Sequence, residues 1–329
     1  MSQTMTKTRF GTTLLAAIFV ASITFAQNVA NATFVQDNAE RTTQSFDVGP
    51  DGEFTLSNIS GNIRIEGMSG DKITVEAVKR LHGRADTDLL DEVRIDISHT
   101  GDRVRVETRY PSDRRHRRGH DHGHGGVSVG YRVTVPVGTE VQVRSVSGDV
   151  YVSGIDGETS VHSVSGKVQV SDTSNLVRAK SVSGDVEVRR ARSEDNIEIA
   201  SVSGEVTVTD VEAEELDVSS VSGDVLMDDV ASEEGEFDSV SGNIHYTGRI
   251  MGGGRYEFKS HSGDIIITIG DDVGFEIEAN TFSGEIESDF EMRVSSGGRH
   301  GQSISAVIGD GSAMIEATTF SGDVMLRKR

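Results

Sequence analysis

Residues 145–152 read Ser-Val-Ser-Gly-Asp-Val-Tyr-Val, and close copies of this stretch recur as far as the C-terminus. The copies lie 18 to 21 residues apart, except for a last interval of 38 that contains a degenerate copy at 303–308, with Ala306 in place of glycine. A regular period of roughly 20 residues is typical of solenoid proteins, in which each repeat stacks on its neighbour. With an earlier copy near residue 61, the structural glycines of the repeat are Gly61, Gly148, Gly166, Gly184, Gly204, Gly223, Gly242, Gly263, Gly284 and Gly322.

Within each copy, apolar residues alternate with polar ones, which is typical of short, half-buried strands. The alternation changes phase just before the motif, and a one-residue shift turns side chains to the opposite face, so this point marks a corner. A repeat of this length must stack on others to bury its apolar face. The sequence therefore predicts an all-β fold, a single-stranded parallel β-helix (β-solenoid) with rungs of about 19 residues and a strand-rich N-terminal part.

Stacking would place equivalent residues above one another at about 4.8 Å. The glycine is expected where the backbone bends or where no room remains for a Cβ atom. The serine directly before it is expected to point outward. The motif valine and its equivalents are expected to form one buried column: Val146, Val164, Val182, Val202, Val221, Val240, His261, Phe282 and Phe320.

The N-terminus is typical of a secretory signal peptide over residues 1–32. Lys7 and Arg9 precede an apolar stretch at 14–25, and Ala30-Asn31-Ala32 offers a cleavage site. An uncleaved anchor is the alternative interpretation. The apolar stretch is too short for the span of a mature membrane protein, and we expect no membrane span in the mature chain.

The remaining chain divides into three parts that differ in composition and in the pattern of apolar residues. A polar, flexible lead-in is expected over 33–45, followed by an N-terminal β-rich part over 46–140 and β-solenoid repeats over 141–329. The N-terminal part contains the first rung, around Gly61, and four longer alternating runs that could form wide rungs or a meander capping the stack. These runs lie at 72–79, 92–98, 103–109 and 129–135.

Composition narrows the classes of partner. The formal net charge is −21, which argues against nucleic acid and anionic membranes as partners and favours solubility. The chain has no cysteine, so it contains no disulfide.

Three patterns could carry chemistry. The segment 111–126 contains four Arg and four His, and His116, His120, His122 and His124 beside Asp121 could bind a transition metal, although a solvated basic loop explains the same residues. The acidic residues after the repeat glycines, such as Asp149, Asp185 and Asp224, would form a column that could bind Ca²⁺, but turn chemistry is the simpler explanation.

The third pattern is the abundance of carboxylates on a β-helix, which is compatible with a carbohydrate-active enzyme. The chain has no Trp, 5 Tyr and 12 Phe, so aromatic residues for stacking on sugars are few. We therefore expect no enzymatic activity, no catalytic residue and no cofactor.

The repeats resemble the putative adhesin family of exported bacterial proteins, also called domain of unknown function 4097. The residues that carry the resemblance are the Ser-Val-Ser-Gly-Asp-Val copies at 145–150, 181–186 and 220–224, the Val-Pro-Val-Gly step at 135–138, and the Phe-Ser-Gly-Asp ending at 320–323. The resemblance covers roughly residues 46–329. It implies a β-helical fold and an exported location, and it supplies no catalytic residues.

Together these observations predict an exported, periplasmic or extracellular, non-enzymatic β-solenoid that acts as an adhesin-like interaction or structural element of the cell envelope. Its partner would be an envelope protein or polysaccharide, and end-to-end self-association is a further option. The alternatives from other classes are a carbohydrate-active β-helix enzyme and a metal-responsive envelope sensor that uses the His-rich loop.

Overall fold

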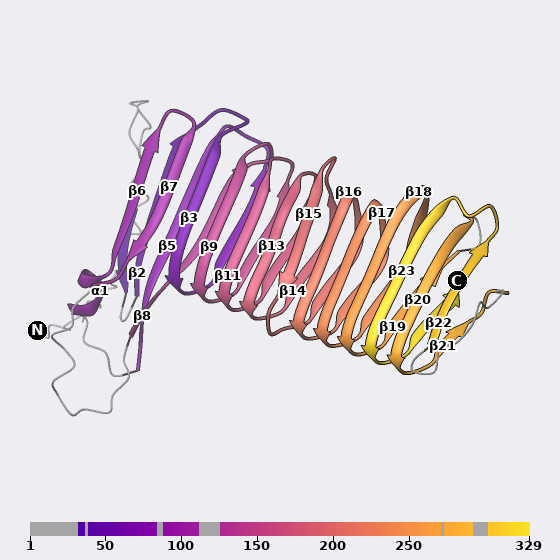
Figure 1. Cartoon of the computed structure of the whole chain (residues 1–329). Coiled ribbons are helices and arrows are strands. Elements are labelled where there is room, and N and C mark those ends of the chain that lie inside the picture. The colour runs from indigo at the N-terminus through magenta and orange to yellow at the C-terminus, as the bar shows by residue number, and fades with distance from the viewer. Residues whose placement is uncertain (1–31, 37–38, 84–87, 112–125, 271–272, 292–301) are drawn as a thin grey trace, which may run out of the picture.

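The computed structural model describes residues 32–36, 39–83, 88–111, 126–270, 273–291 and 302–329. It shows an elongated, all-β stack with the N-terminal strands at one end and the C-terminus at the other (Figure 1). The all-β, solenoid-like fold predicted from the repeat is confirmed. The signal-peptide region, apart from Ala32, and most of the His-rich segment lie outside the described residues.

Two faces of hydrogen-bonded strands form the stack, and we call them the front sheet and the back sheet. The front sheet faces the viewer in Figure 1. In spatial order, its strands are β6 (Arg94–Thr100), β7 (Arg103–Arg109), β3 (Glu53–Ser60), β9 (Glu140–Ser147), β11 (Thr159–Ser165), β13 (Leu176–Ser183), β15 (Asn196–Ser201), the second halves of β16 (Val206–Ser222), β17 (Val225–Ser241) and β18 (Ile244–Ser262), then β23 (Ala313–Ser321), β20 (Phe275–Ser283) and β22 (Gln302–Ile308).

The back sheet contains the strand that follows each corner, and it extends further at the N-terminal end. A single short helix, α1 (Asp88–Glu92), lies beside it among the described residues. In spatial order, its strands are β1 (Ala32–Gln36), β2 (Ala39–Asp47), β5 (Lys72–His82), β8 (Gly126–Pro136), β4 (Ile63–Met68), β10 (Val150–Ile155), β12 (Val168–Thr173), β14 (Val186–Arg192), the first halves of β16, β17 and β18, then β19 (Ile265–Ile269), β24 (Val324–Lys328) and β21 (Ile286–Ser288).

The first rung stacks directly on the rung of Gly148, although a long insertion separates them in sequence. β3 pairs in parallel with β9, and β4 pairs in parallel with β10. The insertion supplies the end cap: β7 and β6 extend the front sheet, while β8 and β5 extend the back sheet. The lead-in expected over 33–45 is wrong in part, because β2 begins at Ala39 and pairs along its whole length with β5.

The C-terminal rungs do not stack in sequence order. The rung of Gly322, built from β23 and β24, lies between the rung of Gly263 and the rung of Gly284. The degenerate copy at 303–308 is not a rung, because it belongs to β22, which runs antiparallel to β20 and pairs Ala306 with Ile277. An antiparallel strand thus covers the front edge of the last rung.

The core lies between the two sheets and consists of one inward stripe from each strand. In the rung of Gly148 the inward apolar residues are at most 1% exposed, and they are Val141, Val143, Val150, Val152 and Ile155. At about 25 cal/mol per Å² of buried apolar surface, this repeated stripe is the main stabilising contribution to the stack.

The predicted buried column of motif valines is wrong. Val146, Val164, Val182, Val202, Val221 and Val240 are 37% to 48% exposed. The residue three places before each glycine is buried instead, and these residues are Asn58, Ser145, Ser163, Ser181, Ser201, Ser220, Ser239, Ser260, Thr281 and Thr319. The serine directly before the glycine points outward, as predicted, for example at Ser147 and Ser183.

At most rungs a hydrogen bond explains why a hydroxyl takes the inward position, whereas the buried Oγ atoms of Ser145, Ser163 and Ser239 have no hydrogen-bond partner among the described residues. Ser201 donates its Oγ proton to the carbonyl oxygen of Gly184 in the rung below, at 2.9 Å, and Ser181 does the same to Gly166 at 3.1 Å. Thr319 and Thr281 repeat this contact at the C-terminal end. A valine facing inward here would leave these carbonyl groups without this partner, at a cost on the order of 1–3 kcal/mol for each buried group.

The repeat glycines are required because they stack on one another. A Cβ atom on Gly204 would lie 2.4 Å from the carbonyl oxygen of Gly184, and one on Gly223 would lie 2.2 Å from that of Gly204. Gly148 and Gly166 also adopt φ angles of 127° and 134°, which disfavour any other residue. The predicted lack of room for a Cβ atom is therefore correct, but the neighbouring backbone, not the core, fills the space.

We expect Gly204→Ala to lower the free energy of unfolding by about 2 kcal/mol or more, because the clash involves backbone that cannot move aside without disturbing two rungs. The matched control is Gly252→Ala, whose Cβ atom would have only Ser312 Oγ near it, at 3.8 Å. Urea unfolding of the two variants measures the difference. Equal, negligible effects of both substitutions would contradict the stacking argument.

Candidate interaction surfaces

The displaced valines form an exposed stripe along the whole stack, which we call the apolar ridge. It follows the corner between the front and back sheets. Its apolar members are 37% to 55% exposed, and in spatial order, with an exposed histidine included, the ridge consists of Ile59, Val146, Val164, Val182, Val202, Val221, Val240, His261, Phe320 and Phe282. Monomeric soluble proteins rarely expose a long contiguous apolar patch without a role for it.

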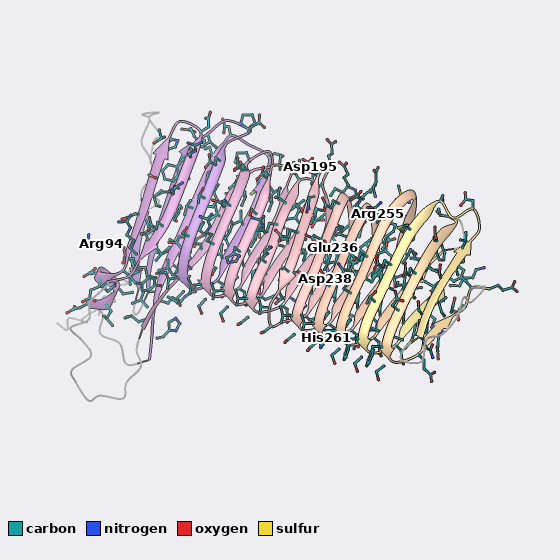
Figure 2. The ribbon with its side chains drawn as sticks, in the orientation of Figure 1. Arg94, Asp195, Glu236, Asp238, Arg255 and His261 are labelled. Carbon is teal, nitrogen blue, oxygen red and sulfur yellow. The ribbon has the colours of Figure 1, made fainter. Side chains whose placement is uncertain are left out.

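The C-terminal end of the ridge is aromatic. The rings of His261 and Phe320 stack at 5.1 Å, and those of Phe320 and Phe282 stack at 4.8 Å with an interplanar angle of 5°. The sequence placed His261 in the buried column, and this prediction is wrong. His261 is exposed and belongs to a surface stack at the lower edge of the front sheet (Figure 2). A shallow groove of about 770 Å³ runs beside the stack and is also lined by Lys259, Asn280 and Gln302.

An acidic column crosses the outer face of the front sheet beside the ridge. Six rungs in succession carry a carboxylate at the same register position, and the residues are Glu198, Asp217, Glu236, Glu257, Glu316 and Glu278. Glu236 and the nearby Asp238 lie on this face in Figure 2.

Two carboxyl groups on this face, those of Asp217 and Asp238, have raised pKa values. Burial, followed by the charges of Glu236 and Glu198, raises the pKa of Asp217 above its ordinary value. Burial and the charge of Glu236 likewise raise the pKa of Asp238, partly offset by Lys259. Ionising either side chain therefore costs folding free energy.

The acidic residues that follow the repeat glycines act as hydrogen-bond acceptors. Asp224 Oδ1 accepts the backbone N–H of Asn243 in the next rung at 2.8 Å, and Asn243 Oδ1 accepts that of Asp264 at 2.9 Å. Asp149, Asp185, Asp264 and Asp323 repeat the contact. These bonds support the turn interpretation of this column, because an amide oxygen serves as well as a carboxylate.

The predicted metal ligands His116, His120, His122 and His124 lie outside the described residues. Within the described ranges, no group of three or more His, Asp or Glu side chains is arranged to hold a metal ion. The described part of the chain also contains no helix long and apolar enough to cross a membrane.

The stacked strands, the glycine ladder and the continuous outer surfaces define a β-solenoid-like repeat protein. The chain belongs to the Toastrack DUF4097 family, whose sequence profile matches residues 36–209 and 133–327. The resemblance predicted from the repeat is therefore confirmed.

Solved structures similar to the chain share little sequence with it. A putative adhesin from Bacteroides fragilis is 10% identical with a TM-score of 0.40, and the alignment covers 88% of this chain and 97% of that one. A putative adhesin and a putative lipid binding protein from Parabacteroides distasonis are each 13% identical with TM-scores of 0.37 and 0.36, over 88% of this chain and 97% and 96% of theirs. No match was found among curated proteins.

We expect Asp224→Asn to unfold like the unsubstituted chain, whereas Asp224→Ala lowers the free energy of unfolding by about 1 kcal/mol, because only the alanine variant loses the acceptor for Asn243 N–H. Thermal unfolding should give the same midpoint in excess Ca²⁺ and in a chelator. A calcium-dependent midpoint that Asp224→Asn abolishes would restore the calcium interpretation.

Stability should also depend on pH through Asp217. A raised pKa means that the folded state favours the protonated form, so the contribution of Asp217 to stability is most favourable below the ordinary Asp pKa of 3.8 and is lost as pH rises through the folded pKa. Asp217→Asn should therefore raise the midpoint of urea unfolding at pH 7 and leave it little changed below that ordinary pKa. Glu214→Gln, at an exposed carboxylate, is the control for net charge, and a gain equal at both pH values would refute this linkage.

Proposed function

We propose that the chain is an exported, non-enzymatic, adhesin-like interaction or structural element of the bacterial cell envelope. It is built as a single-stranded parallel β-helix with rungs of about 19 residues. Register supports the rung length, because Val206 pairs with Val225 and Val225 pairs with Ile244. The signal-like N-terminus, with Lys7 and Arg9 before an apolar stretch, supports export.

The apolar ridge is the observation that carries this proposal. An exposed apolar side chain costs free energy, and its recurrence at all but one rung is not required by the core, which takes the polar residue three places before each glycine instead. Val164, Val182 and Val202 lie in consecutive rungs, about 4.8 Å apart. A partner with a repeating surface can contact many rungs at once, so contacts that are weak singly add up to firm binding.

Outward serines support recognition of a polar, extended partner. Each lies directly after a ridge residue, so the ridge is bordered by hydroxyl groups, which can both donate and accept hydrogen bonds. The bordering residues include Ser147, Ser165, Ser183, Ser203, Ser222 and Ser241. An envelope polysaccharide, with apolar ring faces and many hydroxyls, has the matching chemistry.

The test is co-sedimentation of the purified chain with insoluble bacterial envelope material. A triple variant, Val182→Ser, Val202→Ser and Val221→Ser, should lose about tenfold or more in apparent affinity, because about 1.4 kcal/mol of lost contact gives that factor. Its free energy of unfolding should stay close to that of the unsubstituted chain, since these side chains are exposed.

The matched control is the pair Val137→Ser and Val307→Ser, which removes exposed valines away from the ridge. Binding that is insensitive to the ridge variant, or reduced equally by the control pair, would contradict recognition through the ridge. Release of soluble sugars from the envelope material during the assay would contradict the non-enzymatic assignment.

A further inference from the structure

A second surface lies at the opposite end of the stack from the aromatic part of the ridge. The outer face of the back sheet has a hollow of about 430 Å³ where β2, β5, β8 and β4 lie side by side. We call it the arginine hollow. The charged side chains that line it are Arg41, Arg64, Arg80, Arg132, His82 and Glu76.

Glycine at the centre of a strand keeps the hollow open. Gly130 faces outward in β8, between the buried Val129 and Tyr131. A Cβ atom on Gly130 would have Arg80 Nη1 at 3.7 Å, so any larger side chain would extend into the space among the guanidinium groups. Unlike the repeat glycines, Gly130 is not forced by a backbone clash, since a Cβ atom there makes only ordinary contacts.

Positive charge dominates the hollow, in a chain whose net charge is −21. Glu76 is the one carboxylate among the residues that line the hollow, and its Oε1 atom pairs with Arg41 Nη1 at 3.0 Å. Arg64 lies 4.8 Å from the centre of the Tyr151 ring and only loosely pairs with Glu66, at 3.8 Å.

The guanidinium groups of Arg80 and Arg132 are available to bind a ligand. Arg80 and Arg132 are exposed and form no ion pair within the described ranges. His82 Nε2 and Ser128 Oγ are hydrogen-bonded at 2.6 Å on the same rim, which adds a hydroxyl to the polar groups facing the hollow.

The chemistry of these groups selects the ligand. A guanidinium group presents a planar fork of N–H donors that matches phosphate and carboxylate oxygens. Four such groups against Glu76 and the loosely paired Glu66 leave about two positive charges, which favours a ligand with about two negative charges; a phosphate monoester has these and a single carboxylate lacks them. The volume is within the range of small-molecule sites, so the hollow has room for the phosphate and a sugar-sized carrier.

We propose that the arginine hollow binds a phosphate-bearing ligand, with Arg80 and Arg132 contacting the phosphate oxygens and Gly130 providing the floor. Arg41 and Arg64 are held beside them by Glu76 and Tyr151 and add positive potential. This site is separate from the apolar ridge, and its function does not depend on recognition through the ridge.

Isothermal titration of the full chain tests the proposal with five probes: inorganic phosphate, a hexose 6-phosphate, the uncharged hexose, a hexuronate, and vesicles of a neutral lipid doped with phosphatidic acid. We expect binding of phosphate-bearing probes, weakened by added salt, and no binding of the hexose. Arg80→Gln and Arg132→Gln should each weaken binding about tenfold or more, because each removes a charge-assisted contact. Gly130→Leu should block binding with no change of charge.

Arg105→Gln is the matched control, because Arg105 is an exposed arginine of β7 in the front sheet with no ion pair among the described residues. Binding of hexose 6-phosphate identifies a soluble ligand, and binding of vesicles alone identifies a lipid headgroup. Failure of every phosphate probe to bind below about 1 mM, equal weakening by Arg105→Gln, or tighter binding of a hexuronate than of the hexose phosphate would overturn the proposal. Unfolding curves of the variants confirm that each is folded.

Discussion

The contact between stacked glycines is the constraint on which the rest of the structure depends. At each corner the Cα atom of one glycine lies so close to the carbonyl group of the next that no Cβ atom fits. The same carbonyl accepts a hydrogen bond from a buried hydroxyl, as from Ser201 to Gly184. The following Asp or Asn accepts an N–H group from the neighbouring rung, as Asp224 does from Asn243. The glycine contact recurs from rung to rung, and the two hydrogen bonds strengthen most of the corners, while the inward valines fill the space between the corners.

The sequence predicted most of this fold because a repeat shared by many copies remains recognisable where single copies depart from the pattern. The alternation in each copy predicted half-buried strands, and the structure buries the alternating apolar residues, for example Val141, Val143, Val150 and Val152. It could not show on which side of the phase break the chain turns, and hydrophobicity favoured Val146 over Ser145. The choice is reversed because the inward site is small and lies beside a glycine carbonyl group, to which several of the inward hydroxyls, such as those of Ser181 and Ser201, donate a hydrogen bond. An apolar pattern does not express this preference. The order of the last rungs was unpredictable for another reason, since near-identical copies can pair equally well in either order.

The apolar ridge and the arginine hollow differ in how far they could be predicted from the sequence. The ridge is a column of the repeat, and the sequence identified all of its residues except Ile59, but with the wrong orientation. The arginine hollow was missed because its arginines come from four strands at the N-terminal end of the back sheet, at positions as distant as Arg41 and Arg132, and no repeat relates them. Only the antiparallel pairing of β5 with β2 and β8 brings them together. A cluster of arginines in an acidic chain becomes conspicuous once this pairing is known.

The position of the last rung has a consequence for how the molecule is assembled in time. Residues 313–328 occupy a slot whose two walls, the rungs of Gly263 and Gly284, come earlier in the chain. A chain emerging from N- to C-terminus can add rungs one by one up to Gly263, but the slot stays open until its final segment arrives. Until then, two strand edges with unpaired backbone groups face each other and could accept a foreign strand. Residues 313–328 therefore close this part of the stack, because the rungs of Gly263 and Gly284 are joined only once this segment lies between them.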